Sequence, residues 1–194
     1  MNPANRRVVV ALDFPTVAPA MDLLSGLEPD ACRVKIGKEL FTRAGPVFVE
    51  QVAAMGFDIF LDLKYHDIPN TVAAACAVAA DLGVWMVNLH ASGGRRMMVA
   101  AAERLARLSE PPLLIAVTVL TSVSLLDIKL AGFRHPYRSE MSSLVLKRAG
   151  MAMELGCAGV VCSGKEVKTI KGSLGSDFIA VTPGIRPAWD NVRE

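Results

Sequence analysis

The sequence predicts an α/β protein with a (β/α)8 (TIM) barrel fold, of which seven strands are present in this chain. Short β-branched runs alternate with longer amphipathic runs rich in Ala, Leu and Met, as in repeated βα units around a parallel sheet. Polar residues recur where the short runs end. A barrel brings those ends to one mouth, whereas an open doubly wound sheet, the alternative, would spread them along an edge.

The predicted strands are RVVVALD (7–13), CRVKIG (32–37), DIFLDLK (58–64), VWMVNLH (84–90), LLIAVTVL (113–120), AGVVCS (158–163) and DFIAVTP (177–183). Helical spacing of apolar residues predicts helices near 17–25, 39–55, 69–82, 93–107, 139–155 and 164–172. No linker interrupts the pattern, so residues 1–194 are interpreted as a single barrel domain. Because such barrels usually need about 250 residues, we expect the domain to be C-terminally truncated, without its eighth unit.

The amino-acid composition argues against several classes of function. Hydrophobic residues make up 52% of the chain, the net charge is +2 and aromatic residues are 6%, which argues against a nucleic-acid-binding surface. Apolar runs such as VAAACAVAA are too short to span a membrane. The four cysteines lie in apolar segments without CxxC spacing, as expected of buried, reduced thiols rather than of a disulfide or zinc site. We therefore expect a soluble cytoplasmic protein.

The third predicted strand carries charges where an apolar strand is expected. Side chains two apart share a face, so Asp62 and Lys64 project together, with Phe60 further down the same face. Asp13 and Lys35 lie near the ends of the first two predicted strands. The sequence thus predicts two opposite charge pairs at one mouth.

These pairs have a structural and a chemical interpretation. They would be ion pairs that close the top of the barrel, although desolvating several charges costs several kcal/mol each. Alternatively, carboxylates keep the Lys64 ammonium protonated for a reaction in which negative charge builds on carbon and is then protonated. Lys64 would donate the proton, and Asp62 would orient it and repel a substrate carboxylate that leaves as carbon dioxide.

Several motifs occur in a characteristic order. DLKYHD is followed by IPNT, and VALD, VKIGKELF, GVWMVNLHASGG, LLIAVTVLTS, GVVCS and VTPGIRP occupy their expected places. From about Val8 to Pro187 the chain resembles the bacterial orotidine 5′-monophosphate decarboxylases. The resemblance implies a cofactor-free and metal-free carboxy-lyase that converts orotidine 5′-monophosphate to uridine 5′-monophosphate in de novo pyrimidine synthesis. It also implies a homodimer with shared active sites.

The resemblance further implies residue roles. Asp13 and Lys35 would bind the ribose, and Lys35 would also belong to the catalytic residues. Asp62 would lie beside the departing carboxylate, and Lys64 would protonate C6 of the pyrimidine. Asp67, a catalytic residue in this reading, and Thr71 would reach into the neighbouring subunit's site. The implied substrate contacts are completed by Thr121 at the pyrimidine, Pro183 near the base and Arg186 near the phosphate.

The sequence departs from the family after Thr121, in SVSLLDIKLAGFRHPYRSEMSS, and in lacking the glycine-arginine phosphate grip of the eighth unit. Two alternatives remain. A magnesium-dependent phosphosugar decarboxylase or aldol synthase of the same superfamily would place a carboxylate near the end of the second strand, where this chain has Lys35. A catalytically impaired, truncated barrel would act as an interaction protein. His66 and His90 are interpreted as structural.

Overall fold

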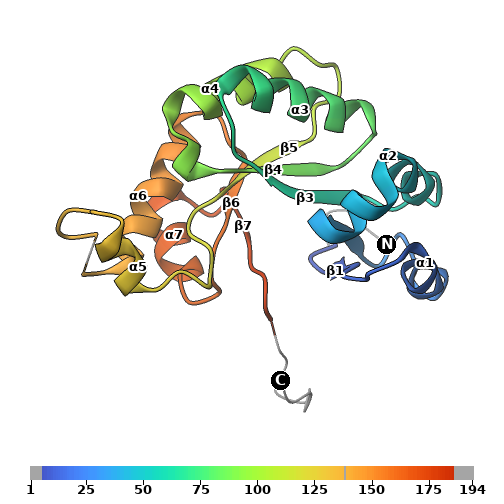
Figure 1. Ribbon diagram of the computed structural model, residues 1–194, viewed down its shortest axis with the longest axis horizontal. Coiled ribbons are helices and arrows are strands. Elements are labelled where there is room, and N and C mark those ends of the chain that lie inside the picture. Colours follow the sequence, from blue (N-terminus) through green and yellow to red (C-terminus); the bar gives the residue numbers. More distant parts are fainter. Residues whose placement is uncertain (1–5, 138, 186–194) are drawn as a thin grey trace.

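The strands form one parallel sheet in which strand order follows chain order. The computed structural model describes residues 6–137 and 139–185. Within them, seven strands pair in the order β1 to β7, each with the next along the chain. Their bounds are β1 (Val9–Ala11), β2 (Arg33–Gly37), β3 (Ile59–Tyr65), β4 (Met86–His90), β5 (Leu113–Val117), β6 (Gly159–Val161) and β7 (Ile179–Val181). Figure 1 shows that the sheet curls, with the helices outside it.

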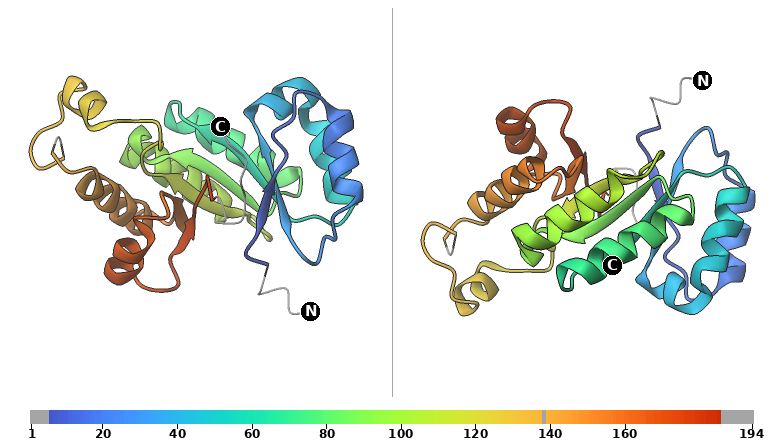
Figure 2. Two further views of the ribbon diagram at one scale, coloured as in Figure 1. Left: turned by 90° about the horizontal axis from the view of Figure 1, so that it is seen from below. Right: turned by 90° about the horizontal axis from the view of Figure 1, so that it is seen from above.

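A helix follows most strands and returns the chain to the start of the next one. The helices are α1 (Val17–Ser25), α2 (Lys38–Ala54), α3 (Pro69–Asp81), α4 (Arg95–Leu105), α5 (Leu125–Leu130), α6 (Met141–Glu154) and α7 (Val167–Leu174), with a 3-10 turn, η2 (Ala91–Gly93), after β4. The two views of Figure 2 place α1 and α2 at one end of the curl and α6 and α7 at the other. α3 begins at Pro69, whose missing N–H costs nothing in the first helical turn.

Two apolar cores lie on opposite faces of the sheet. The larger core fills the layer between the sheet and the helices and includes Ile59 and Leu61 of β3. The smaller core lies on the inner face and consists of Phe60, Met86 and Ile115. The alternation along β3 is the one that the strand period predicts. The charged residues that follow Phe60 therefore stand above an apolar floor.

The prediction of a (β/α) barrel with seven strands is confirmed, as a curled half-barrel. Among the described residues, β1 pairs only with β2 and β7 only with β6, so the two end strands do not meet. Figure 1 shows these two strands as the margins of the curl. All the ladders are parallel, and the carboxyl ends of the strands therefore lie on one side.

Three local features differ from the predictions. The first and last strands pair over only three residues each, because the ladder stops before the polar ends of the predicted runs. The helix predicted over 39–55 is broken by Gly45, with φ of 66°, followed by Pro46. The helix α5 was not predicted; a reciprocal hydrogen-bonded cap between Ser124 and Asp127 begins it.

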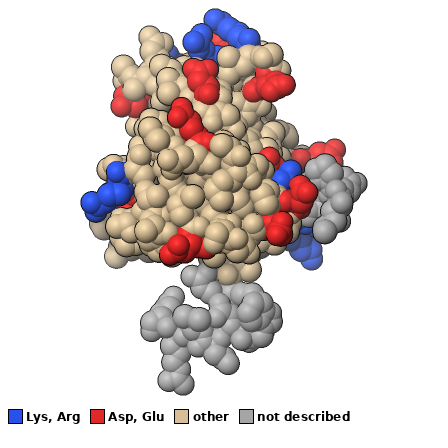
Figure 3. Space-filling model, turned by 90° about the vertical axis from the view of Figure 1, so that its right-hand side faces the viewer, with Lys and Arg blue, Asp and Glu red and all other residues tan. Residues whose placement is uncertain are grey.

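The cysteine prediction is confirmed, since Cys32, Cys76, Cys157 and Cys162 are all free and buried. Burial raises the pKa of both Cys76 and Cys157 to about 12. No helix within the described ranges is long and apolar enough to cross a membrane. On the side of the molecule that bears α1 and α2, acidic and basic side chains are scattered over a largely uncharged surface (Figure 3).

Candidate active site

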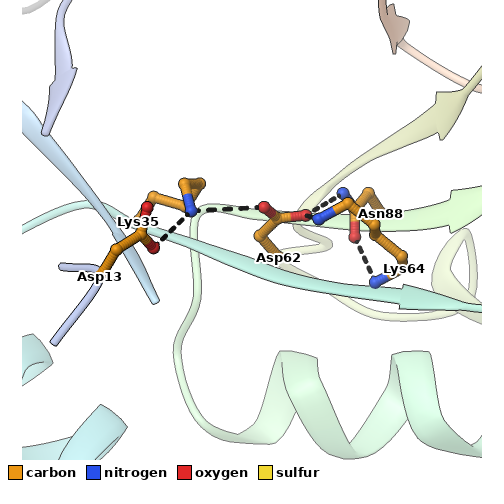
Figure 4. A network of polar contacts seen from close by, with 5 residues as sticks. All are labelled: Asp13, Lys35, Asp62, Lys64 and Asn88. Atoms are coloured by element: carbon orange, nitrogen blue, oxygen red, sulfur yellow. Dashed lines mark hydrogen bonds and ion pairs between the residues drawn. The ribbon is translucent and has the colours of Figure 1, made fainter. Parts of the chain in front are cut away.

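Four charged side chains form a line of alternating sign at the carboxyl ends of the first three strands. Nζ of Lys35 lies 3.0 Å from Oδ1 of Asp13 and 3.4 Å from Oδ2 of Asp62. Nζ of Lys64 donates a 2.7 Å hydrogen bond to Oδ1 of Asp62. Figure 4 shows the line running from Asp13 to Lys64. The predicted convergence of these four residues is therefore observed, and we call them the charged line.

Burial is greatest at the centre of the charged line. The side chain of Asp62 is 11% exposed, while those of Lys35 and Lys64 are 20% and 27% exposed. Asp13, at the outer end, is 66% exposed. Coulomb interactions are stronger where water is displaced, so the two contacts of Asp62 contribute more than the contact of Asp13. The result is a carboxylate held between two ammonium groups.

The environment keeps Asp62 ionised. Burial alone would raise its pKa, but hydrogen bonds from Lys64 and Asn88 and the charges of Lys64 and Lys35 outweigh burial, so its pKa lies below the ordinary value. At neutral pH the site therefore carries a fixed negative charge beside the Lys64 ammonium. This arrangement can repel a substrate carboxylate at one point and deliver a proton at the next.

The backbone at Lys64 departs from a regular strand. Lys64 has φ of 53°, a left-handed conformation that is uncommon outside glycine. The pairing of β3 with β4 shifts between Leu61 and Tyr65, so Lys64 lies in an irregularity of the ladder. Strand alternation predicts that Asp62 and Lys64 share a face, and the observed contact agrees. The periodicity of apolar residues does not predict the left-handed conformation of Lys64.

Asn88 is a site residue that sequence reasoning missed. It is fully buried in β4. Its Nδ2 donates a 2.7 Å hydrogen bond to Oδ1 of Asp62, and its Oδ1 accepts a 2.7 Å hydrogen bond from the backbone N–H of Lys64. A signal was available, because Asn88 is a lone polar residue inside the apolar run WMVNL, two positions before His90.

Asp67, Thr71, Thr121 and Pro183, the other predicted site residues within the described ranges, form no hydrogen bond or ion pair with the charged line. Asp67 and Thr71 are exposed at the start of α3, and Oδ1 of Asp67 accepts a 2.6 Å hydrogen bond from the N–H of Ile68. Thr121, after β5, and Pro183, after β7, are exposed. Arg186 lies outside the described residues. The roles predicted for these residues stay predictions.

Two histidines lie near one another beside the charged line. The rings of His66 and His90 have centroids 5.4 Å apart and are tilted by 39°. Burial lowers the pKa of His90, and the nearby charges of His66, Lys38, Lys64 and Arg148 lower it further. His90 therefore favours its neutral form at neutral pH.

The charged line places an ammonium group between its two carboxylates. In the described part of the chain, no group of three or more His, Cys, Asp and Glu side chains could hold a metal ion. The Lys35 ammonium occupies the space between the Asp13 and Asp62 carboxylates, where a cation would otherwise bind.

Comparison with known proteins decides the family. The model of the orotidine 5'-phosphate decarboxylase / HUMPS family matches residues 6–193. The chain belongs to this family. A curated family relative, orotidine 5'-phosphate decarboxylase of Halorhodospira halophila, is 55% identical over 186 residues, which cover 96% of this chain and 77% of the relative. The enzyme of the same name from Laribacter hongkongensis is 57% identical over 93% of this chain and 73% of its own length.

Solved structures agree with the family assignment. The crystal structure of orotidine 5'-phosphate decarboxylase from Lactobacillus acidophilus has a TM-score of 0.86 at 41% identity, covering 95% of this chain and 83% of that one. An uncharacterized conserved protein from Geobacillus kaustophilus has a TM-score of 0.82, also at 41% identity. Nearly the whole of this chain therefore has the same fold as the solved decarboxylase.

Proposed function

We propose that this protein decarboxylates orotidine 5′-monophosphate to uridine 5′-monophosphate, the carboxy-lyase reaction of de novo pyrimidine synthesis, with Lys64 as the proton donor. Family membership and the names of the curated relatives support the reaction. The observation that carries the proposed mechanism is the 2.7 Å contact between Nζ of Lys64 and Oδ1 of Asp62. This contact supports a role for Lys64 as proton donor beside the negative charge of Asp62.

In the proposed reaction, the carboxylate on C6 of the pyrimidine lies beside Asp62. The bond between C6 and the carboxyl carbon breaks, carbon dioxide leaves and the electron pair stays on C6. The departure removes the repulsion between two carboxylates, and the Lys64 ammonium stabilises the new charge. A proton then passes from Nζ of Lys64 to C6, and the lysine regains a proton from water.

The remaining residues are proposed to bind the nucleotide. Asp13 and Lys35 would hold the ribose hydroxyls, and their 3.0 Å ion pair orients both groups before substrate arrives. Thr121 would contact the pyrimidine and Pro183 the face of the base. Arg186 would meet the phosphate. Binding energy from such remote contacts acts in the transition state as well as in the ground state.

A homodimer in the cytoplasm is the proposed working form. Asp67 and Thr71 are exposed beside Ile68, an apolar side chain that is 67% exposed. Packing this segment against a second subunit would cover Ile68 and carry Asp67 toward the partner's substrate. The dimer would then contain two shared sites related by its two-fold axis.

The alternatives receive less support. A magnesium-dependent phosphosugar enzyme needs a carboxylate where this chain has Lys35, whose ammonium contacts Asp13 and Asp62. A binding protein without activity would have no use for a partly buried line of charges, because apolar residues stabilise a barrel at least as well.

The test is to mix the purified protein with orotidine 5′-monophosphate and follow the loss of the orotate ultraviolet absorbance, with and without a chelator. We expect equal rates in both samples and uridine 5′-monophosphate as the product. Loss of activity in the chelator that returns with added magnesium would contradict the proposed metal-free mechanism. No absorbance change with either sample would contradict the proposed reaction.

A further inference from the structure

The buried amide of Asn88 joins the two halves of the proposed catalytic pair. Its Nδ2 donates to Oδ1 of Asp62, the same oxygen that accepts from Nζ of Lys64, and its Oδ1 accepts from the backbone N–H of Lys64. One side chain thus contacts the carboxylate of one residue and the main chain of the other. Figure 4 shows Asn88 against both.

The irregular pairing of β3 explains why the second contact exists. Leu61 pairs with Val87 and Tyr65 pairs with Leu89, so four steps along β3 correspond to two steps along β4. The extra residues leave the regular ladder, as in a bulge. The N–H of Lys64 is bound by a side-chain oxygen of β4 at 2.7 Å. Asn88 therefore holds the left-handed turn that aims the lysine.

We infer that Asn88 is a positioning residue for the decarboxylation, which fixes the Asp62 carboxylate and the turn at Lys64 in one geometry. The catalytic part of this inference rests on the proposed function. An amide suits the position because its nitrogen donates to Asp62 while its oxygen accepts from the N–H of Lys64. An aspartate would keep the acceptor for Lys64 but lose the donor to Asp62, and an alanine would lose both.

Two variants separate these contacts. Asn88→Asp removes the donor to Asp62 and places a second carboxylate beside it, and Asn88→Ala removes both contacts. Val87→Ala is the matched control, since Val87 is the neighbouring, fully buried residue of β4 and packs in the core against the helices. It perturbs strand packing without touching the charged line.

We expect both Asn88 variants to lower kcat by about 10- to 100-fold, because small displacements of reacting groups have effects of this size, with a smaller change in KM. The acid limb of the kcat/KM profile should move to higher pH, since Asp62 loses a hydrogen bond that favours its charged form. Val87→Ala should leave the position of that limb unchanged. A kcat within about twofold of wild type in Asn88→Asp would overturn the inference.

A second measurement does not depend on turnover. The ¹³C resonance of the Asp62 carboxyl carbon, assigned by its loss in Asp62→Asn, reports the titration of that group directly. In Asn88→Asp and Asn88→Ala its midpoint should move to higher pH, and in Val87→Ala it should not. If the wild-type protein lacks decarboxylase activity, the proposed function fails, and this titration alone decides whether Asn88 holds Asp62: an unmoved midpoint means that it does not.

Discussion

Nζ of Lys64 lies 2.7 Å from Oδ1 of Asp62, and both side chains are largely buried at the mouth of the half-barrel. Removing one member of a buried pair leaves the other charged and without its partner, which is more costly than losing the attraction itself. Here Lys35 also contacts Asp62, at 3.4 Å, and shares in its neutralisation. Substitutions along the charged line are therefore expected to affect activity and stability together.

Lys64→Ala should abolish measurable decarboxylation while uridine 5′-monophosphate still binds. The proposed role of Lys64 is to give a proton to C6, and the product already carries that proton, so its affinity should fall only modestly. Turnover is followed by ultraviolet absorbance and product binding by calorimetry. Lys168→Ala, on the exposed side of α7, serves as the control and should behave as wild type. Undiminished turnover in Lys64→Ala would rule out the proposed role.

Mixing Lys64→Ala with Asp67→Ala should restore part of the activity that each lacks alone. If the site is shared, a mixed dimer has one site with both residues intact. Half of the dimers in an equal mixture are mixed, so roughly one quarter of wild-type activity is expected after complete subunit exchange. Exchange is verified with differently tagged subunits. Complete exchange without any recovery would show that Asp67 does not act across a dimer interface.

The contribution of Asp62 to stability should depend on pH. Its folded-state pKa lies below the ordinary value, so its stabilising effect is present above the unfolded pKa of about 3.9 and is lost as the pH falls through the folded pKa. The difference in free energy of unfolding between wild type and Asp62→Asn should therefore be largest near neutral pH and shrink below about pH 4. Urea unfolding of both proteins at several pH values measures this difference in free energy. A pH-independent difference would contradict the assigned environment.

Gly159→Ala should destabilise the protein, whereas Gly172→Ala should not. A Cβ on Gly159 in β6 would overlap the carbonyl oxygen of Ile179 in β7, so the strands would have to separate. Overpacking of this kind typically costs 1–3 kcal/mol, and about that loss is expected. Gly172 lies exposed inside α7, and its added Cβ would meet no atom within 4 Å apart from its chain neighbours and the backbone of its own helix, so alanine there should gain up to about 1 kcal/mol. Thermal unfolding compares the two, and equal effects would be evidence against close packing of β6 on β7.

The charged line was predictable because it depends on two regularities alone. Side chains alternate along a strand, and parallel strands end on the same side of a sheet, so Lys35, Asp62 and Lys64 had to meet if the barrel assignment was right. The charge pattern itself suggested roles for Lys64 and Asp62, and the family resemblance added the role of Lys35 at the ribose. The break in α2 could also have been predicted, because Gly45 and Pro46 are adjacent in the sequence. The apolar periodicity of the segment instead favoured one continuous helix.

Asn88 and the turn at Lys64 were not predictable in the same way. The shifted register of β3 against β4 depends on contacts between strands, and periodicity within one strand carries no information about it. The short helix α5 lies in a stretch of weak apolar periodicity, where a local cap between Ser124 and Asp127 decides the structure. Roles for Asp67 and Thr71 across a subunit interface depend on a second chain rather than on the fold of one.

The sequential order of the strands has a consequence for how the protein reaches its native state. Each strand pairs with the next one along the chain, so the sheet needs no pairing between non-consecutive strands among the described strands. Each of these pairings spans a crossover connection and is therefore not a local contact, which makes parallel sheets slow to form, but the strict order lets the sheet grow by one unit at a time. The charged line and Asn88 come from the first four strands, between residues 13 and 88. During synthesis, every residue of the charged line and Asn88 is therefore made before β5 to β7.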